Sequence, residues 1–464
     1  MSSDMTTLID PATERPIAEI PNQGVEETDA AVARSAAAGP AWRAVAPADR
    51  ARLLRRFAAQ VEDHAEQLAQ LETANVGKAI VESRDEVGMM AEVLYFYAGA
   101  VDKHRGATVP VAGGVDMTFH EPLGVVGAIV PWNFPIAITS WKVGPALATG
   151  NTIVVKPAEI TPLTALRLAE LALDAGLPEG VLQVVVGKGS VVGTRLVEHP
   201  DVAKVAFTGS TEVGRDVMSR ASGTIKRVTL ELGGKSASVI FADADIEKAA
   251  AATPGGVFAN AGQDCCARSR VLVQRSVLDR YLGLLTAAVA DWTVGDPTDP
   301  TVKMGPLVTA AHRRTVAGFL DAGMGAPGGG PVAAFAAGPV PDGPGFWFPP
   351  TVVAPADPDW RMAREEIFGP VVAVIPFDDE EDAVRLANDT PYGLSGSIWT
   401  RDGARALRMA RAIESGNLSV NSHSSVRVQT SFGGMKQSGF GRELGLEALA
   451  SYSDVKNVFV ATDG

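Results

Sequence analysis

The chain has 464 residues, of which 46% are hydrophobic and 20% charged, a composition typical of roughly two or three globular domains that excludes intrinsic disorder. Its formal net charge of −13, without any basic tract, argues against nucleic acid or an anionic membrane as a partner. Its two cysteines, Cys265 and Cys266, are adjacent, so a disulfide framework is excluded and a reducing, cytoplasmic compartment is expected.

The first residues and the histidines give no sign of export or of a metal site. Residues 1–10 lack the basic and apolar regions of a secretory signal. The six histidines are scattered singly, and no CxxC or HExxH spacing occurs, so no metal is expected. Residues 122–141 carry no charge over 20 residues, enough to span a bilayer, but three prolines interrupt them. We therefore predict a buried strand, a tight turn and a new helix there, and no membrane span.

Helices dominate the start of the chain, and strands alternate with helices afterwards. The spacing of apolar residues predicts helices over 49–75 and 81–103. Thr161 followed by Pro162 is typical of a helix start, and Gly176 of its end. The predicted strands are 125–130, 152–155, 181–186, 204–207, 227–230 and 238–241. Repeated βαβ units of this size predict an α/β fold with a mostly parallel sheet.

A second α/β stretch begins near residue 270. Its predicted strands are 270–274, 371–376 and 396–400, and its predicted helices are 277–292 and 380–388. Residues 323–350 contain 15 Gly or Pro in 28 positions. That composition predicts a long irregular connection between the two halves of this stretch.

Three residues are candidates for chemistry. Cys265 in FANAGQDC (258–265) is either a nucleophile, since a thiolate is highly reactive, or a small buried apolar side chain. Glu231 ends an apolar strand in VTLELGGKS (228–236), where ligands of α/β sheets bind, so it is a general base or an exposed charge. Asn133 in PWNFP (131–135) either donates to an oxyanion or satisfies its own turn.

Other motifs fit a dinucleotide. Glycine-rich turns at 187–193 and 209–214 each follow a strand and open a helix, as in phosphate-binding loops, although plain turns have the same pattern. Lys156 and Glu159 follow a strand, where they either hold ribose hydroxyls or form a solvated pair. Glu366 in EEIFGP (365–370) either takes part in the site or belongs to an acidic loop.

The order and spacing of these motifs resemble the aldehyde dehydrogenase superfamily. The matching segments begin near residue 20 and are PWNFP, WKVGPALATGNTIVVKPAE, FTGSTEVG, ELGGKS, FANAGQDC, EEIFGPV and SFGGMKQSGFGRELG. The resemblance implies an α/β fold with a Rossmann-like cofactor domain (1–103 and 123–232) and a cysteine-bearing catalytic domain (233–435). It also implies a small β oligomerisation element (104–122 and 436–464), and hence a homodimer or homotetramer.

The same resemblance implies roles for single residues. Cys265 is then the nucleophile, Glu231 the general base and Asn133 the oxyanion donor, with Lys142 and Glu443 on a proton route. Residues matched to cofactor binding are Trp132, Lys156, Glu159, Gly189, Gly193, Gly209, Ser210, Leu232, Glu366 and Phe368. Residues expected along or beside the substrate tunnel are Phe134, Ile138, Trp141, Val426, Arg427 and Phe432.

The implied activity is NAD-dependent oxidation of an aldehyde to its carboxylic acid through a thiohemiacetal and a thioester on Cys265. Glu231 favours hydrolysis of that thioester over acyl transfer to coenzyme A, and Glu159 favours NAD, with NADP as the alternative. A cysteine hydrolase or acyltransferase without redox chemistry is the competing enzyme class. A non-catalytic binding protein on this fold is the third hypothesis.

Two features bear on the substrate, without settling it. Arg427 either pairs with the carboxylate of a semialdehyde or is an ordinary surface arginine. The GQDC motif (262–265) is similar to that of amino- and betaine-aldehyde enzymes. Substrates of that kind require acidic residues at the tunnel mouth, which the sequence alone does not reveal.

Overall fold

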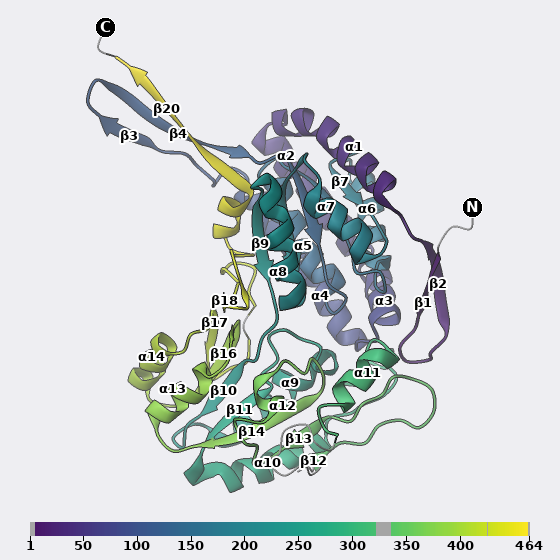
Figure 1. The fold of residues 1–464 in the computed structure, drawn as a ribbon, viewed down its shortest axis with the longest axis vertical. Helices are drawn as coiled ribbons and strands as arrows, with labels where there is room; N and C mark the ends of the chain where they lie inside the picture. The colour runs from purple at the N-terminus through teal and green to yellow at the C-terminus, as the bar shows by residue number, and fades with distance from the viewer. Residues whose placement is uncertain (1–4, 322–335, 425, 463–464) are drawn as a thin grey trace.

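The computed structural model describes residues 5–321, 336–424 and 426–462. Figure 1 shows two α/β lobes along the long axis of the molecule, with a β-arm projecting from the upper lobe. The chain passes into the lower lobe after β9 (Arg227–Glu231) and returns to the upper lobe after β17 (Asn417–Val420). The two crossings bring segments from both lobes to one boundary.

The upper lobe is built on a six-stranded sheet in the order β19-β9-β8-β5-β6-β7. All neighbours in it are parallel except β19, which is antiparallel to β9. The other strands are β5 (Val125–Ile129), β6 (Thr152–Lys156), β7 (Leu182–Val184), β8 (Val202–Thr208) and β19 (Gly439–Phe440). Every residue of β6 is buried, as expected for a parallel strand covered on both faces.

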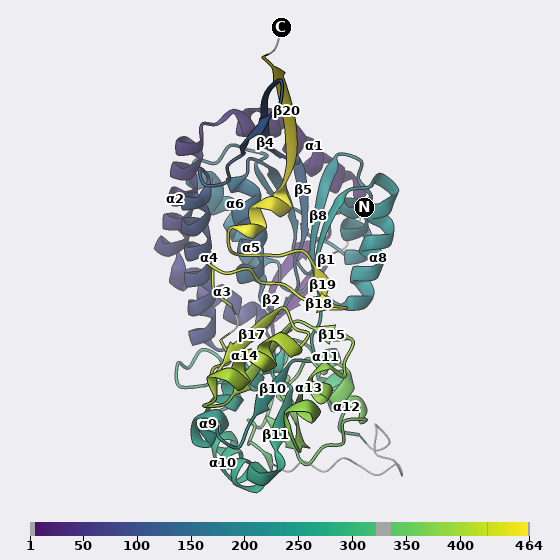
Figure 2. The same ribbon diagram turned by 90° about the vertical axis from the view of Figure 1, so that its left-hand side faces the viewer.

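Helices cover both faces of this sheet, with α2 and α4 on one side and α8 on the other (Figure 2). The helices are α1 (Val25–Ala44), α2 (Pro47–Asp63), α3 (Ala65–Val76), α4 (Ile80–Ala100), α5 (Pro135–Ala148), α6 (Leu163–Asp174), α7 (Thr194–Glu198) and α8 (Thr211–Ala221). All residues of α5 are buried. Because α5 begins directly after the PWNFP turn, its core packing fixes the position of that turn.

The lower lobe contains a seven-stranded sheet in the order β12-β13-β14-β11-β10-β16-β17, parallel except for β12. Its remaining strands are β10 (Ala237–Ile240), β11 (Arg270–Gln274), β12 (Ala336–Ala337), β13 (Thr351–Val353), β14 (Val371–Phe377) and β16 (Ser395–Trp399). Its helices are α9 (Ile246–Phe258), α10 (Leu278–Ala290), α11 (Ala310–Ala317), α12 (Arg361–Arg364), α13 (Glu380–Asn388) and α14 (Gly403–Ala412). A separate hydrophobic core fills this lobe.

The arm is a three-stranded antiparallel sheet in the order β20-β4-β3. It joins β3 (Thr108–Val111) and β4 (Gly114–Pro122) to β20 (Ser453–Ala461), so the end of the chain pairs with a segment near residue 115. Two smaller sheets are β1 (Met5–Ile9) with β2 (Pro16–Pro21), and β15 (Tyr392–Gly393) with β18 (Met435–Lys436). Short helical turns are η1 (Gly189–Gly193), η2 (Ser222–Thr224), η3 (Ala259–Gly262), η4 (Arg275–Val277) and η5 (Glu447–Tyr452).

The predicted α/β fold and its parallel strands are confirmed, and two helix predictions are wrong in detail. The helix expected over 49–75 is broken at His64, whose φ of −109° is not helical and whose Nδ1 lies 2.9 Å from the Gln60 carbonyl. Thr161 does not cap α6, because Pro162 occupies the cap position and makes no side-chain hydrogen bond.

The uncharged segment 122–141 forms β5, a turn and the start of α5, as predicted. Within the described residues, no helix combines the length and the apolar character needed to cross a bilayer. Of the expected irregular connection, 323–335 lies outside the described residues, Ala336–Ala337 forms the short strand β12, and 338–350 contains neither helix nor strand.

Candidate active site

Three side chains from separate elements face one cavity. Asn133 immediately precedes α5, Glu231 is the last residue of β9, and Cys265 follows η3. All three line a cavity of about 250 Å³ where the lobes meet. The structure therefore brings together the nucleophile, the base and the oxyanion donor expected from the sequence, although they are far apart along the chain.

A tight loop carries Cys265. Asn260 and Ala261 have left-handed φ values of 48° and 55°, which are unusual for residues with a Cβ atom. Gly262 follows at φ 70°, where an added Cβ would lie 2.3 Å from the backbone of Gly369. The loop places Cys265 where the 250 Å³ cavity meets a second cavity of about 430 Å³. A substrate in the second cavity and a cofactor in the first would therefore meet at this thiol.

The surroundings of Cys265 favour the neutral thiol. A hydrogen bond with the Cys266 thiol, burial and the negative charge of Asp264 raise the pKa of Cys265 well above its usual value. The carboxylate of Asp264 and the thiols of Cys265 and Cys266 lie within 4.8 Å of one another. Because the thiolate is the reactive form, Cys265 needs a positive charge or a base beside it to react near neutral pH.

Hydrogen bonds hold Asn133 at both its side chain and its backbone. Its Nδ2 donates to the Gln263 carbonyl at 2.9 Å, so the amide is fixed to the cysteine loop. Its carbonyl accepts from Asn260 Nδ2 at 2.9 Å and from Lys78 Nζ at 2.8 Å. A primary amide has two N–H donors, so one is left to donate to an oxygen near Cys265.

Glu231 is a buried carboxyl group with 4% of its surface exposed. Among the described residues, neither of its carboxyl oxygens has a hydrogen-bond partner. Burial and the nearby Glu443 raise its pKa well above the usual value. Lys142 forms an ion pair with Glu443 and donates to Thr208 Oγ1 at 2.7 Å. An acid with a raised pKa beside a buried ion pair suits proton transfer near neutral pH.

The 250 Å³ cavity also carries most of the residues expected to hold the cofactor. It is lined by Trp132, Gly209, Ser210, Leu232, Glu366 and Phe368. Ser210 is the N-cap of α8, its Oγ accepting from the Val213 N–H at 3.3 Å, so a helix N-terminus that favours phosphate opens here. The rings of Trp132 and Phe368 pack edge to face, 5.2 Å apart.

Two glycines keep Glu366 close to the cysteine loop. Glu366 accepts from the Gly234 N–H at 2.9 Å. An added Cβ on Gly233 would lie 2.2 Å from the Glu366 carboxylate, and one on Gly234 would lie 2.3 Å from the Cys265 carbonyl oxygen. The Gly-Gly turn after Glu231 therefore permits a close approach that larger residues would prevent.

The residues expected at the adenosine lie at the end of β6, in the turn after it and in η1, and they are not among the described residues that line the 250 Å³ cavity. Lys156 ends β6, where burial lowers its pKa to about 8, although the negative charge of Glu159 acts to raise it. Gly189 and Gly193 bound a single π-helical turn, η1, that precedes the helix expected there. An added Cβ on Gly193 would lie 3.9 Å from Lys156 Cδ, so the turn and the lysine are adjacent.

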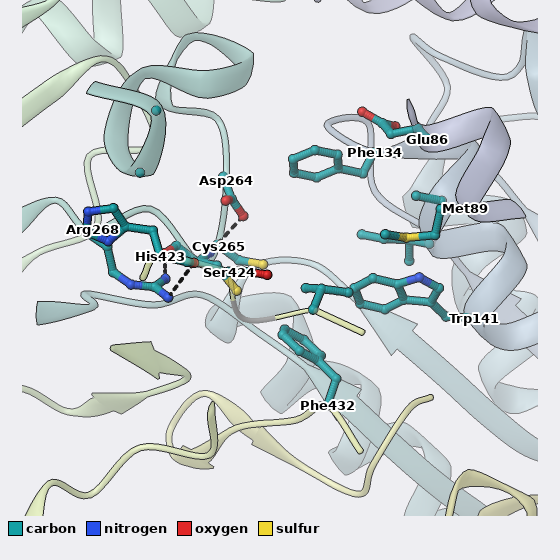
Figure 3. A pocket seen from close by; sticks show the side chains of 16 residues that line it. Glu86, Met89, Phe134, Trp141, Asp264, Cys265, Arg268, His423, Ser424 and Phe432 are labelled. Carbon is teal, nitrogen blue, oxygen red and sulfur yellow. Dashed lines mark hydrogen bonds between the residues drawn. The ribbon is translucent and has the colours of Figure 1, made fainter. Parts of the chain in front are cut away.

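The 430 Å³ cavity has a largely apolar wall with two acidic side chains. Its apolar members include the expected residues Phe134, Ile138, Trp141, Val426 and Phe432, together with Met89. Glu86 and Asp264 also line it, as do the His423 ring and Arg268, which donates to the carbonyl oxygens of Cys266 and His423. Figure 3 shows Asp264 and Cys265 facing Phe134 and Trp141 across this space, with Glu86 beyond Phe134 on α4.

Arg427 is not among the described residues that line this cavity, which favours the surface-arginine alternative over a contact with a semialdehyde carboxylate. Its side chain is exposed, and its Nη1 donates to the Ser424 carbonyl at 3.4 Å. Val426 and Val428 on either side of it pack against the core, while the arginine side chain itself faces solvent.

Three residues near the site, Lys78, Glu86 and Met89, were not predicted from the sequence. Glu86 and Met89 are three positions apart on α4, which places them on one helix face, but nothing local shows that this face borders the substrate. Lys78 lies in the loop between α3 and α4; its two carboxylate contacts come from these flanking helices, and its third contact, the Asn133 carbonyl, is 55 positions away along the chain.

Comparison with known proteins agrees with this geometry. Residues 1–458 match the model of the Aldehyde dehydrogenase family. The chain is 42% identical to the NADP/NAD-dependent aldehyde dehydrogenase PuuC of Escherichia coli K12, covering 98% of this chain and 92% of that protein. It is 42% identical to a phenylacetaldehyde dehydrogenase of Pseudomonas fluorescens, covering 99% and 93%. The crystal structure of PnpE from Pseudomonas sp. WBC-3 with nicotinamide adenine dinucleotide superposes with a TM-score of 0.95, at 42% identity, covering 99% and 95%.

Proposed function

The chain belongs to the aldehyde dehydrogenase family, which oxidises aldehydes to acids with nicotinamide dinucleotides, and we propose that it does so through Cys265, Glu231 and Asn133. The observation that carries this proposal is the single cavity that all three residues line. We assign residues 1–103 and 123–232 to cofactor binding, 233–435 to catalysis, and 104–122 with 436–464 to assembly.

The residues around the 250 Å³ cavity fit a nicotinamide dinucleotide. The α8 N-terminus at Ser210 suits the pyrophosphate, and Glu366 with Phe368 suits the nicotinamide ribose and ring. Lys156 and Glu159 suit the adenosine ribose, because an amine and a carboxylate bind its hydroxyls from the end of a strand. NAD, when bound, accepts the hydride that leaves the substrate carbon. Since Glu159 would repel a 2′-phosphate, we propose NAD as the preferred form.

The first step takes place at Cys265. The Cys265 thiol first releases its proton to solvent; the resulting thiolate adds to the aldehyde carbon, and the carbonyl oxygen becomes the oxyanion of a thiohemiacetal. The free N–H of Asn133 and the backbone N–H of Cys265 would stabilise that charge, and loss of one such donor typically costs about 10²–10³ in rate. Loss of hydride from the same carbon leaves a thioester on Cys265.

The second step is hydrolysis of that thioester. Glu231 removes a proton from water, the resulting hydroxide attacks the acyl carbon, and the Cys265 thiolate departs, leaving the carboxylic acid. The ion pair of Lys142 and Glu443 lies beside Glu231, and we propose that it passes the proton outward.

For the substrate, we propose an aldehyde with a positive charge at its far end, such as an ω-amino aldehyde. Glu86 and Asp264 give the 430 Å³ cavity two carboxyl groups, and Oε2 of Glu86 is buried without a hydrogen-bond partner among the described residues. An ammonium group would supply that partner. The apolar wall between Glu86 and Cys265 would contact the intervening carbon chain.

For assembly, we propose a homodimer or homotetramer in a reducing, cytoplasmic setting. The arm strand β20 leaves an edge and exposed side chains such as Val455 and Phe459. Unpaired strand edges of this kind favour pairing with a second chain. The two free cysteines support a reducing compartment.

The reaction is tested by stopped-flow measurement of NADH with the Glu231→Gln variant. We expect a burst of NADH stoichiometric with active sites, followed by very slow turnover, because the thioester forms but is not hydrolysed. Cys265→Ala should give neither burst nor turnover. Ester hydrolysis without nicotinamide, together with no NADH from any aldehyde, would instead favour a cysteine hydrolase.

A further inference from the structure

Lys78 is a buried cation to which the function above gives no role. It lies in the loop between α3 and α4, and its side chain has no exposed surface. Its Nζ is 2.5 Å from Glu86 Oε1 and 3.9 Å from Glu72 Oε1. It also donates to the carbonyl of Asn133 at 2.8 Å.

The contact with Asn133 is not needed for charge balance, since Glu86 and Glu72 already provide counter-charges. The carbonyl of Asn133 is gripped from two directions, by Lys78 Nζ and by Asn260 Nδ2. Only two covalent bonds separate that carbonyl carbon from the Cβ that carries the amide. A displacement of the carbonyl therefore displaces the amide that faces Cys265.

Glu72 holds the next residues of the same segment. Its Oε1 accepts from the Ile136 N–H at 3.2 Å, and its Oε2 accepts from Thr164 Oγ1 at 2.8 Å. Ile136 is in the first turn of α5, so a carboxylate satisfies one of the unpaired donors at this helix start. Lys78, which lies beside Glu72, thus fixes the carbonyl just before the helix that Glu72 anchors.

We propose that Lys78 is a positioning residue that holds the Asn133 amide in place for the oxyanion, an inference that rests on the function proposed above. Lys78 lines neither the 250 Å³ nor the 430 Å³ cavity, so it acts through Asn133 and does not touch substrate. Misplacement of a catalytic group by about 1 Å costs on the order of 10²-fold in rate.

The test is a double-mutant cycle on the rate of the NADH burst, measured with a short uncharged aldehyde so that Glu86 meets no ammonium group. Lys78→Met should slow the burst by about 10- to 100-fold, and Asn133→Ala by about 10²–10³-fold. In the Asn133→Ala background, Lys78→Met should change the rate by less than about 3-fold, because both act through one amide. Affinity for NAD should be unchanged. Lys226→Met, which removes a lysine bond to the His199 carbonyl, is the matched control and should keep the burst rate.

Each outcome separates this inference from the proposed function. A normal burst in Asn133→Ala would refute the oxyanion role and the proposed function with it. Two results would overturn only the role of Lys78. One is a slow burst in Asn133→Ala with a normal burst in Lys78→Met; the other is a double variant whose loss of rate equals the product of the two single losses.

A second variant covers the case in which Lys78→Met does not fold. Lys78→Met/Glu86→Leu replaces the buried ion pair by apolar groups, a change that proteins often tolerate. The burst should remain slow in this variant, because the Asn133 carbonyl still lacks its lysine donor and keeps only the bond from Asn260 Nδ2. A wild-type burst would show that charge balance is the only role of Lys78 and would overturn the proposal.

Discussion

Neutralising Glu86 should separate charged from uncharged substrates. Lys78 Nζ lies 2.5 Å from Glu86 Oε1, and the Glu86→Gln variant keeps an oxygen that can accept from it. The variant removes the negative charge of Glu86 from the 430 Å³ cavity. A hydrogen bond to a charged group contributes about 1.5–3 kcal/mol. At about 1.4 kcal/mol per tenfold change, kcat/KM for an ω-amino aldehyde should fall by roughly 10- to 150-fold.

The assay compares an ω-amino aldehyde with an uncharged aliphatic aldehyde of equal length, in wild type, Glu86→Gln and a control. Glu92→Gln alters an exposed carboxylate on the same helix and should change neither substrate. Burial raises the pKa of Glu86 to about 8, so its charge is lost as pH falls through that value. Selectivity for the amino aldehyde should therefore increase as pH rises through about 8 in wild type and in Glu92→Gln, but not in Glu86→Gln. An equal loss for both substrates in Glu86→Gln, or better turnover of an ω-carboxy or aromatic aldehyde by wild type, would refute the reasoning.

Three further predictions concern the rest of the site. Burial and Glu443 raise the pKa of Glu231, so this base becomes protonated at pH values well above the ordinary glutamate range. The steady-state rate should therefore fall as the pH is lowered through that higher range. The residual rate of Glu231→Gln should not show this fall. Gly234→Ala should abolish the NADH burst while leaving a folded protein by circular dichroism, since the added Cβ would lie 2.3 Å from the Cys265 carbonyl oxygen; a normal burst would contradict that clash. Glu159→Gln should raise the NADP-to-NAD ratio of kcat/KM by about tenfold, or ~1.4 kcal/mol, through lost repulsion of the 2′-phosphate; an unchanged ratio would place the discrimination elsewhere.

The local order of the chain could be predicted because it depends on neighbouring residues. Apolar runs of β6 and β11 and the periodic spacing of α13 follow from side-chain burial at regular intervals, and the structure has these elements close to their predicted bounds. The helix break at His64 was not predictable in this way, since the apolar periodicity continues through it, and only the structure shows the non-helical φ of His64 and its contact with the Gln60 carbonyl.

The residues of the site also fall into two groups, those identified from sequence motifs and those identified only from tertiary contacts. The order and spacing of the motifs, through their resemblance to aldehyde dehydrogenases, singled out Cys265, Glu231 and Asn133. What surrounds them depends on contacts between segments far apart in sequence: the Lys78 ammonium under Asn133, Glu86 at the substrate cavity, and the outward direction of Arg427. Burial and charge pairing are properties of packed neighbours, so the raised pKa of Glu231 and the carboxyl groups at the substrate cavity depend on tertiary packing and not on local sequence.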